Sequence, residues 1–210
     1  GRVTGKTGPY SIGVLNMLTN DEPAAGIAQT NFTVARVRRD ILRRSNIGAL
    51  FTNRSVSTVA PGSNAVLGAD VNFAFYQNVF MSGYVAQSRT EGRSGDNLNY
   101  RAQFNYTADR YGLAVDRLVV EEHFNPEVGF MRRDNFRRSF VQGRFSPRTQ
   151  SNPLVRKWTS EASLDYVTDN ANRLESRNLT GSFSTEFHSS DTASVEYSRL
   201  YEFIPAPFSI

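Results

Sequence analysis

Apolar and polar side chains alternate strictly over residues 97–109 of this chain. Successive side chains of a β-strand point to opposite faces, so the pattern predicts one long strand with an apolar face and a polar face. The apolar positions are Leu98, Tyr100, Ala102, Phe104, Tyr106 and Ala108. The same period recurs over residues 65–75 and 177–187. The sequence therefore predicts an all-β protein.

Weaker versions of this pattern predict further strands, for a total of about eleven. They lie near residues 10–19, 29–38, 47–55, 79–87, 111–120, 138–146, 155–167 and 192–202. Strands of soluble proteins average about 5–6 residues, whereas a tilted strand needs about 9–11 to cross the hydrocarbon of a bilayer. Because several of these strands are long, we expect an antiparallel meander that forms part of a transmembrane β-barrel.

The predicted connections alternate roughly between short and long. Tight turns are expected at 76–78, 109–110 and 189–191, and longer polar stretches at 88–96, 121–136 and 168–172. Outer-membrane barrels have short periplasmic turns at one rim and longer external loops at the other. The links at 39–46 and 146–154 make the alternation imperfect. Aromatic residues beside the tight turns are typical of an interfacial girdle, although they could also cap the core of a soluble sandwich.

One segment has two interpretations. Residues 34–42 could form a basic amphipathic helix, with Val34, Val37 and Ile41 near one face. We favour a hairpin that turns near residues 40–45, because a strand-like pattern with Ile47 and Phe51 resumes directly afterwards.

Composition excludes some classes of protein and leaves others open. The absence of cysteine excludes a disulfide framework, and no run of about 18 uncharged apolar residues predicts a membrane-spanning helix. The net charge of +4 does not point to nucleic acid, because the basic residues are dispersed among acidic ones. The chain starts without a signal peptide, and residues 205–210 are unlike a terminal barrel strand. We therefore expect residues 1–210 to be a single segment of a larger barrel.

Motifs for catalysis or cofactor binding are weak. The segment GRVTGKT at 1–7 has one residue too few for a phosphate-binding loop and precedes a strand-like pattern. Glu121, Glu122 and His123 would need a further partner to form a metal or acid–base site, so a solvated strand end is preferred. We predict no catalytic, cofactor-binding or metal-ligating residue.

Polar residues on the faces opposite the apolar ones are the candidates to line a barrel lumen. Arg101 shows why, since an unpaired Arg facing lipid at the bilayer midplane costs about 2–4 kcal/mol. The candidate lumen-facing residues are Asp70, Asn72, Asn99, Arg101, Gln103, Asn105, Asn178, Ser182 and Glu186.

Several stretches of the chain resemble one family. They are GKTGPYSIG at 5–13, VRRDI at 37–41 with SNIG at 45–48, GAD at 68–70, and FNPEVGFMRR at 124–133. Together they are similar to the uncharacterised C-terminal domain of Gram-negative outer-membrane proteins that carry an N-terminal family-nine-like carbohydrate-binding module. The resemblance implies a large barrel in the bacterial outer membrane and gives no catalytic residue to transfer. These 210 residues do not include the module, so sugar binding is not assigned to them.

The last of these stretches is the candidate functional loop. Asn125-Pro126 favours a turn, and Gly129 permits unusual backbone angles. The loop either braces the barrel or forms a constriction or partner-docking element. Its candidate residues are Asn125, Pro126, Glu127, Gly129, Phe130, Arg132 and Arg133, and its arginines, with Arg137 and Arg138, are candidates to pair with lumen carboxylates.

We expect a non-enzymatic role in structure, transport or anchoring of an attached module. The expected partners are outer-membrane lipid and an attached carbohydrate-binding module or periplasmic partner, without nucleic acid or a cofactor. Two alternatives remain at this point. One is a soluble all-β carbohydrate-binding module, and the other is a glycan-processing hydrolase that uses lumen carboxylates.

Overall fold

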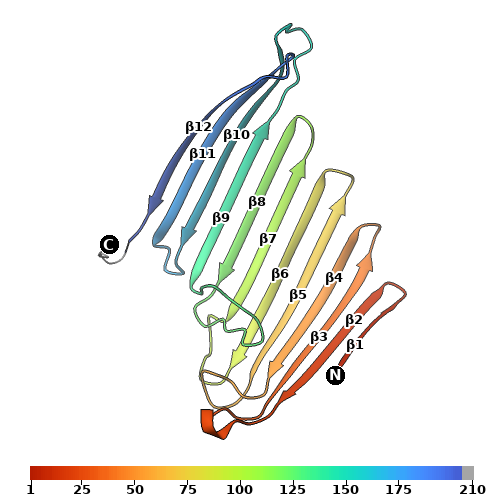
Figure 1. The fold of residues 1–210 in the computed structure, drawn as a ribbon, viewed down its shortest axis with the longest axis vertical. Coiled ribbons are helices and arrows are strands. Elements are labelled where there is room, and N and C mark those ends of the chain that lie inside the picture. The colour runs from red at the N-terminus through yellow and green to blue at the C-terminus, as the bar shows by residue number, and fades with distance from the viewer. Residues whose placement is uncertain (205–210) are drawn as a thin grey trace. The chain divides into compact units, whose positions relative to one another are not determined.

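A computed structural model describes residues 1–204 as one antiparallel sheet of twelve strands with a single short 3-10 helix (Figure 1). The strands follow the order of the chain from β1 to β12, so each is paired with its neighbours in sequence. The elements are β1 (Arg2–Thr7), β2 (Tyr10–Thr19), η1 (Pro23–Ala25), β3 (Thr30–Ile41), β4 (Ser45–Arg54), β5 (Asn64–Phe75), β6 (Val79–Thr90), β7 (Leu98–Thr107), β8 (Tyr111–Val120), β9 (Phe136–Phe145), β10 (Val155–Thr168), β11 (Leu174–Phe187) and β12 (Thr192–Glu202). The predicted all-β antiparallel meander is confirmed.

The structure corrects the predicted number of strands and decides between the two interpretations of residues 34–42. The count of about eleven was one short within the described residues, because β1 pairs with β2 from Arg2↔Leu15 to Thr7↔Tyr10. The segment 34–42 is part of β3 rather than a helix, and the hairpin to β4 turns at Leu42, whose φ of 52° is left-handed. The expectation for residues 205–210 lies outside the described residues.

The chain divides into two compact units, which are described separately. The first consists of Gly1–Ala74, Ser82–Ala102 and Val119–Phe136. The second consists of Phe75–Met81, Gln103–Leu118 and Arg137–Ile210. Strands β1 to β4 belong to the first unit and β10 to β12 to the second, whereas β5 to β9 contribute residues to both.

Connection lengths differ between the strand ends of the first unit. Short turns at 8–9 and 42–44 lie at one end, and longer connections at 20–29, 55–63, 91–97 and 121–135 lie at the other. In the second unit, the turns at 76–78, 108–110 and 188–191 are short and the connection at 146–154 is longer. The predicted alternation therefore holds in the first unit, whereas in the second unit the connection at 146–154 is longer than expected and the one at 169–173 is a short turn.

Large apolar side chains are exposed on one face of the first unit. One row crosses four strands through the register Val14↔Ala35↔Phe51↔Leu67. Val14 is 42%, Phe51 40% and Leu67 62% exposed. This face is therefore apolar but is not covered by another part of the unit.

The second unit has an apolar face of the same kind. The register Phe145↔Ser160↔Phe183↔Val195 runs across β9 to β12, and its Phe and Val side chains are exposed. The predicted alternation of apolar and polar faces thus extends over these strands. No helix of residues 1–204 is long and apolar enough to cross a membrane.

Candidate functional site

An ion pair spans three strands on the polar face of the first unit. Arg36 Nη1 on β3 lies 2.6 Å from Asp70 Oδ2 on β5, and Arg36 Nη2 donates to Asp70 Oδ1 at 2.9 Å. Strand β4 contributes Gly48 between them, and a Cβ there would lie 2.7 Å from Asp70 Oδ2. The absence of a side chain at Gly48 therefore lets the pair form over the intervening strand.

The other candidate lumen residues of the first unit also have neighbours on this face. Asn72 donates to Asn46 Oδ1 at 3.1 Å, and Asn99 accepts from the Tyr84 hydroxyl at 3.1 Å. Arg101 lies on β7 in alternation with Asn99. Asp70 and Asn99 both border a cavity that lies beside residues 124–130.

The second unit carries its own polar cluster, centred on Arg138. The Arg138 guanidinium pairs with Asp165 at 2.6 Å and lies 3.8 Å from Asp116. Gln103 extends the cluster by donating to Asp116 Oδ2 at 3.5 Å. Arg138 therefore does pair with carboxylates, as expected from the sequence.

The remaining candidates lie elsewhere in the second unit. Asn105 borders a small cavity of about 160 Å³ with Gln142, Arg144 and Glu161. Asn178 accepts from Ser198 at 3.1 Å, Ser182 is in register with Glu161, and Glu186 pairs with Arg156 at 2.9 Å. These residues are distributed along the strands and do not form one site.

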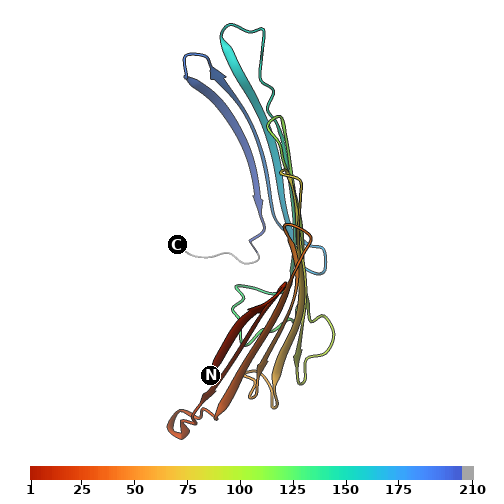
Figure 2. The ribbon, with the colours of Figure 1, turned by 90° about the vertical axis from the view of Figure 1, so that its right-hand side faces the viewer.

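The candidate loop, residues 121–135, folds back beside the strands of the first unit, where it lies on one side of the strands (Figure 2). Its first residues form hydrogen bonds with residues 95–98, at the start of β7. The Glu121 carboxylate accepts from Leu98 N–H at 2.7 Å, His123 N–H donates to Asp96 O at 2.8 Å, and the His123 ring Nδ1 is 3.1 Å from Gly95 O. Glu121 and His123 thus anchor the loop. The part of the chain that the structure describes contains no cluster of three or more His, Cys, Asp or Glu that could hold a metal.

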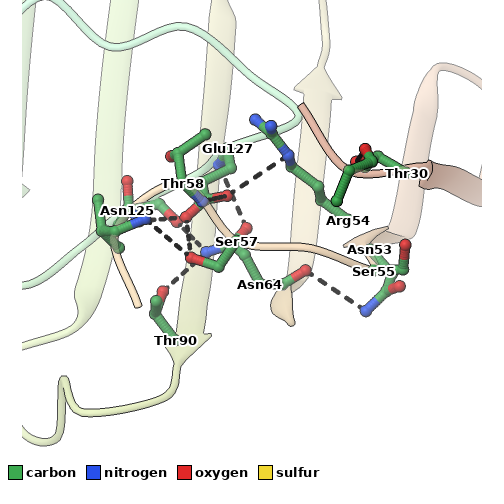
Figure 3. A network of polar contacts seen from close by, with 12 residues as sticks. Thr30, Asn53, Arg54, Ser55, Ser57, Thr58, Asn64, Thr90, Asn125 and Glu127 are labelled. Atoms are coloured by element: carbon green, nitrogen blue, oxygen red, sulfur yellow. Dashed lines mark hydrogen bonds and ion pairs between the residues drawn. The ribbon is translucent and has the colours of Figure 1, made fainter. Parts of the chain in front are cut away.

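Asn64, the first residue of β5, holds the loop by its side chain (Figure 3). Its amide nitrogen donates to Asn125 O at 2.7 Å and to Thr90 Oγ1 at 2.8 Å, and its oxygen accepts from Glu127 N–H at 3.2 Å. Asn64 is 0% exposed. A buried amide with three partners is fixed in place, because losing any of them would leave a polar group without compensation.

The Glu127 carboxylate is the charged centre of the same network (Figure 3). It accepts from Ser57 Oγ at 2.5 Å, Thr58 N–H at 2.9 Å and Asn125 Nδ2 at 3.0 Å. Arg54 Nε lies 3.7 Å from Glu127 Oε2, and the Glu127 side chain is only 3% exposed. With both oxygens engaged and almost no exposure, this carboxylate is suited to holding the loop rather than to reacting with a substrate.

Apolar packing supplements the polar network. Phe124 is 4% exposed, and Val66 on β5 is 5% exposed. Ser88 is 1% exposed and accepts from Asn125 N–H at 2.9 Å. The loop residue Phe124 therefore belongs to the small buried core of the first unit.

A cavity of about 530 Å³ lies between this loop and the polar face of the first unit. Loop residues Phe124, Pro126 and Phe130 form one side, and the Arg36–Asp70 pair belongs to the lining. Phe130 is 87% exposed, in contrast to the buried Phe124. The loop thus leaves a groove beside it and does not seal the face.

The arginines after the loop core behave differently from one another. Arg137 donates to the amide oxygens of Asn170 and Asn172 at 3.1 and 2.9 Å, not to a carboxylate. Arg133 lies 5.1 Å from the centre of the Phe136 ring, and Arg132 is exposed. The ion pair of the loop uses Arg54, which no pattern in the sequence indicated.

Comparisons with protein-family models, curated proteins and solved structures find no match to this chain. The two sheet faces and the loop held by Asn64 and Glu127 are consequently the features that bear on function.

Proposed function

We propose that the chain forms part of the wall of a bacterial outer-membrane β-barrel, with its polar face toward the lumen and loop 121–135 as a fixed constriction. The role is structural and transport-related rather than catalytic. Residues Asp70, Asn72 and Asn99 would line the lumen beside the loop, and Phe51 and Leu67 would face lipid.

The exposed apolar row of the first unit is the observation that carries this proposal. Val14, Phe51 and Leu67 remain between 40% and 62% exposed, whereas the opposite face holds the Arg36–Asp70 pair. Burial of apolar surface is worth about 25 cal/mol per Å², so a row this wide is unfavourable in water. Acyl chains would cover it at no such cost, and a paired Arg36 on the lumen side avoids placing a charge in lipid.

Strand length supports the same proposal. Strands β3, β5 and β6 each have 12 residues, and β10 and β11 each have 14. A strand that crosses the hydrocarbon at a tilt needs about 9–11 residues. These five strands are therefore long enough to span a bilayer with residues to spare.

The loop network supports a constriction that stays in place. Glu127 has four partners and 3% exposure, and Asn64 has three partners and 0% exposure. A gating segment would be expected to have weaker attachment, since mobile elements have few buried contacts. The groove of about 530 Å³ beside the loop would remain as the open part of the lumen in this region.

Fractionation of cells that contain the natural full-length protein tests the proposal. We expect the protein in the detergent-extracted outer membrane, with an electrophoretic mobility in SDS that changes on boiling, because a closed barrel resists SDS until heated. Recovery in buffer without detergent, and without a mobility change, would contradict it and would favour a soluble all-β binding module.

A further inference from the structure

An arginine on the apolar face marks the short-turn end of the first unit. Arg39 on β3 lies with its guanidinium carbon 5.4 Å from the centre of the Tyr10 ring. The register Tyr10↔Arg39↔Ile47 places these residues in one row across β2 to β4. The next row toward the middle of the strands contains Ile12 and Val37. The apolar face thus ends at an aromatic ring covered by a cation.

The second unit repeats this arrangement with a different residue. Arg110, in the turn between β7 and β8, lies 5.5 Å from the Tyr111 ring and 5.3 Å from the Phe145 ring. The two rings are stacked with centres 5.3 Å apart. Leu113 and Val115 continue the apolar face along β8 and are about 40% exposed. Both units therefore have an arginine on a tyrosine ring at one end of an apolar face.

Two other arginines near these strand ends are paired with carboxylates, but Arg39 and Arg110 are not. Arg38 pairs with Asp40 at 3.6 Å, and Arg148 pairs with Asp109 through contacts of 2.9 and 3.0 Å. Among residues 1–204, neither Arg39 nor Arg110 forms an ion pair with a carboxylate. Their guanidinium groups instead contact the faces of aromatic rings.

The chemistry of this combination fits a lipid phosphate. A guanidinium stacked on a ring keeps its N–H edge available, and that edge matches the oxygens of a phosphate. Aromatic residues prefer the headgroup level of a bilayer, and basic residues near that level are attracted to anionic lipids. A free phosphate ion would gain nothing from the adjacent apolar rows, whereas the acyl chains of a phospholipid would cover them.

We propose that Arg39 and Arg110 bind the headgroup phosphates of anionic phospholipids where the apolar face of each unit ends. The proposal rests on the membrane function proposed above and adds a lipid class and two contact residues. Each basic residue near an anionic surface contributes about fivefold to binding at low salt. Removing both should lower the preference for anionic vesicles by about 25-fold.

Vesicle flotation with the full chain tests this inference. Unfolded protein is diluted at low ionic strength into vesicles of phosphatidylcholine alone or of phosphatidylcholine with about one third phosphatidylglycerol. We compare the double variant Arg39→Gln/Arg110→Gln with the control Arg38→Gln/Arg148→Gln, since both lower the net charge of +4 by two. The first should lose the preference for anionic vesicles, and the control should keep it. Arg39→Lys/Arg110→Lys should retain most of it, which separates charge from damage to the fold.

The outcomes distinguish the two proposals. If both Gln variants keep the preference for anionic vesicles, the assignment of Arg39 and Arg110 is wrong, and the membrane proposal is unaffected. Failure of the unaltered chain to float with either vesicle overturns the membrane proposal, and the lipid assignment with it. Loss in both Gln variants alike also overturns the assignment, because it would reflect net charge alone.

Discussion

The two units of this chain are stabilised in different ways. In the first, loop 121–135 covers part of the polar face, and the buried apolar side chains found among residues 1–204 all lie there, namely Val66, Val119, Val120 and Phe124. In the second, β12 is exposed along its whole length, and the Arg138–Asp165 pair is about one-third exposed. The first unit therefore has a small buried core of its own, whereas the second is held together mainly by hydrogen bonds between its strands.

Substitutions of buried groups in the first unit should therefore cost more stability than substitutions of exposed groups in the second. Removing a buried hydrogen-bonding group costs about 1–3 kcal/mol, whereas an exposed ion pair contributes about 0–1 kcal/mol. Matched substitutions in the two units should consequently have unequal effects, although they remove similar groups.

The largest effect is expected from Asn64→Ala. It leaves the Asn125 carbonyl, the Thr90 hydroxyl and the Glu127 amide without a buried partner, so the free energy of unfolding should fall by about 3 kcal/mol. The control in the second unit is Asn178→Ala, where the exposed amide contacts Thr180 and Ser198, with an expected loss below about 0.5 kcal/mol. Urea unfolding in detergent micelles, followed by circular dichroism, measures both. Equal losses would show that the loop does not form an interior.

A smaller effect is expected from Glu127→Gln. The substitution leaves the half-buried Arg54 without its carboxylate, at a cost of about 2 kcal/mol. Hydrogen exchange over residues 124–130 should accelerate, because the loop is released before the strands separate.

Asp165→Asn is the matched change in the second unit. Arg138 keeps Asp116 at 3.8 Å and is partly solvated, so we expect a loss of about 0.5 kcal/mol and unchanged exchange in β9. If Asp165→Asn accelerated exchange in β9 more than Glu127→Gln accelerates it in the loop, the second unit would be the more sensitive of the two, contrary to expectation.

Gly48→Ala tests the ion pair that spans three strands. The new Cβ would lie 2.7 Å from Asp70 Oδ2 and 2.8 Å from Arg36 Nη2, so the pair must separate, at about 1 kcal/mol. Gly181→Ala in the second unit has open space around its Cβ and should be neutral or slightly stabilising. Comparison of the two urea midpoints measures the difference, and a neutral Gly48→Ala would mean that the pair contributes nothing.

The smallest effect is a dependence on pH in the second unit. The backbone N–H of Arg173, followed by its side chain, lowers the pKa of Asp169 in the 169–173 turn below the usual 3.8. A lowered folded-state pKa stabilises the turn above pH 3.8 and ceases to do so as the pH falls through the lowered value. Amide exchange at Arg173 should therefore be slower than in Asp169→Asn near neutral pH and equal to it in strong acid. A difference that persists in strong acid would contradict this linkage.

Strands were predictable from the sequence because their period of two is a local property. Strand β1 was missed because Thr4 and Lys6 alternate with Val3 and Gly5 in a run too short to show an apolar face. The hairpin after β3 was predicted from the strand pattern that resumes at Ile47, although Leu42 was not expected to adopt a left-handed backbone.

The loop was predictable as a feature but not in its contacts. Asn125-Pro126 and Gly129 indicated a turn, and the structure has Gly129 N–H donating to Pro126 O at 2.9 Å. The residues that hold the loop, Ser57 and Asn64, are more than 60 positions away and look like ordinary polar residues of a connection and a strand end. Only the pairing of β4 to β7 brings them beside the loop, and a single sequence does not contain that information.

Two adjacent positions of β5 can show whether one face of the sheet contacts lipid. The chain contains no cysteine, so Val71→Cys and Asn72→Cys each provide one site for an environment-sensitive fluorophore. Val71 belongs to the exposed apolar face, and Asn72 is bonded to Asn46 on the polar face. After reconstitution in phospholipid vesicles, a quencher on the acyl chains should reduce the fluorescence at position 71 and leave that at position 72 unchanged. Equal quenching at both positions, or none at either, would contradict the account.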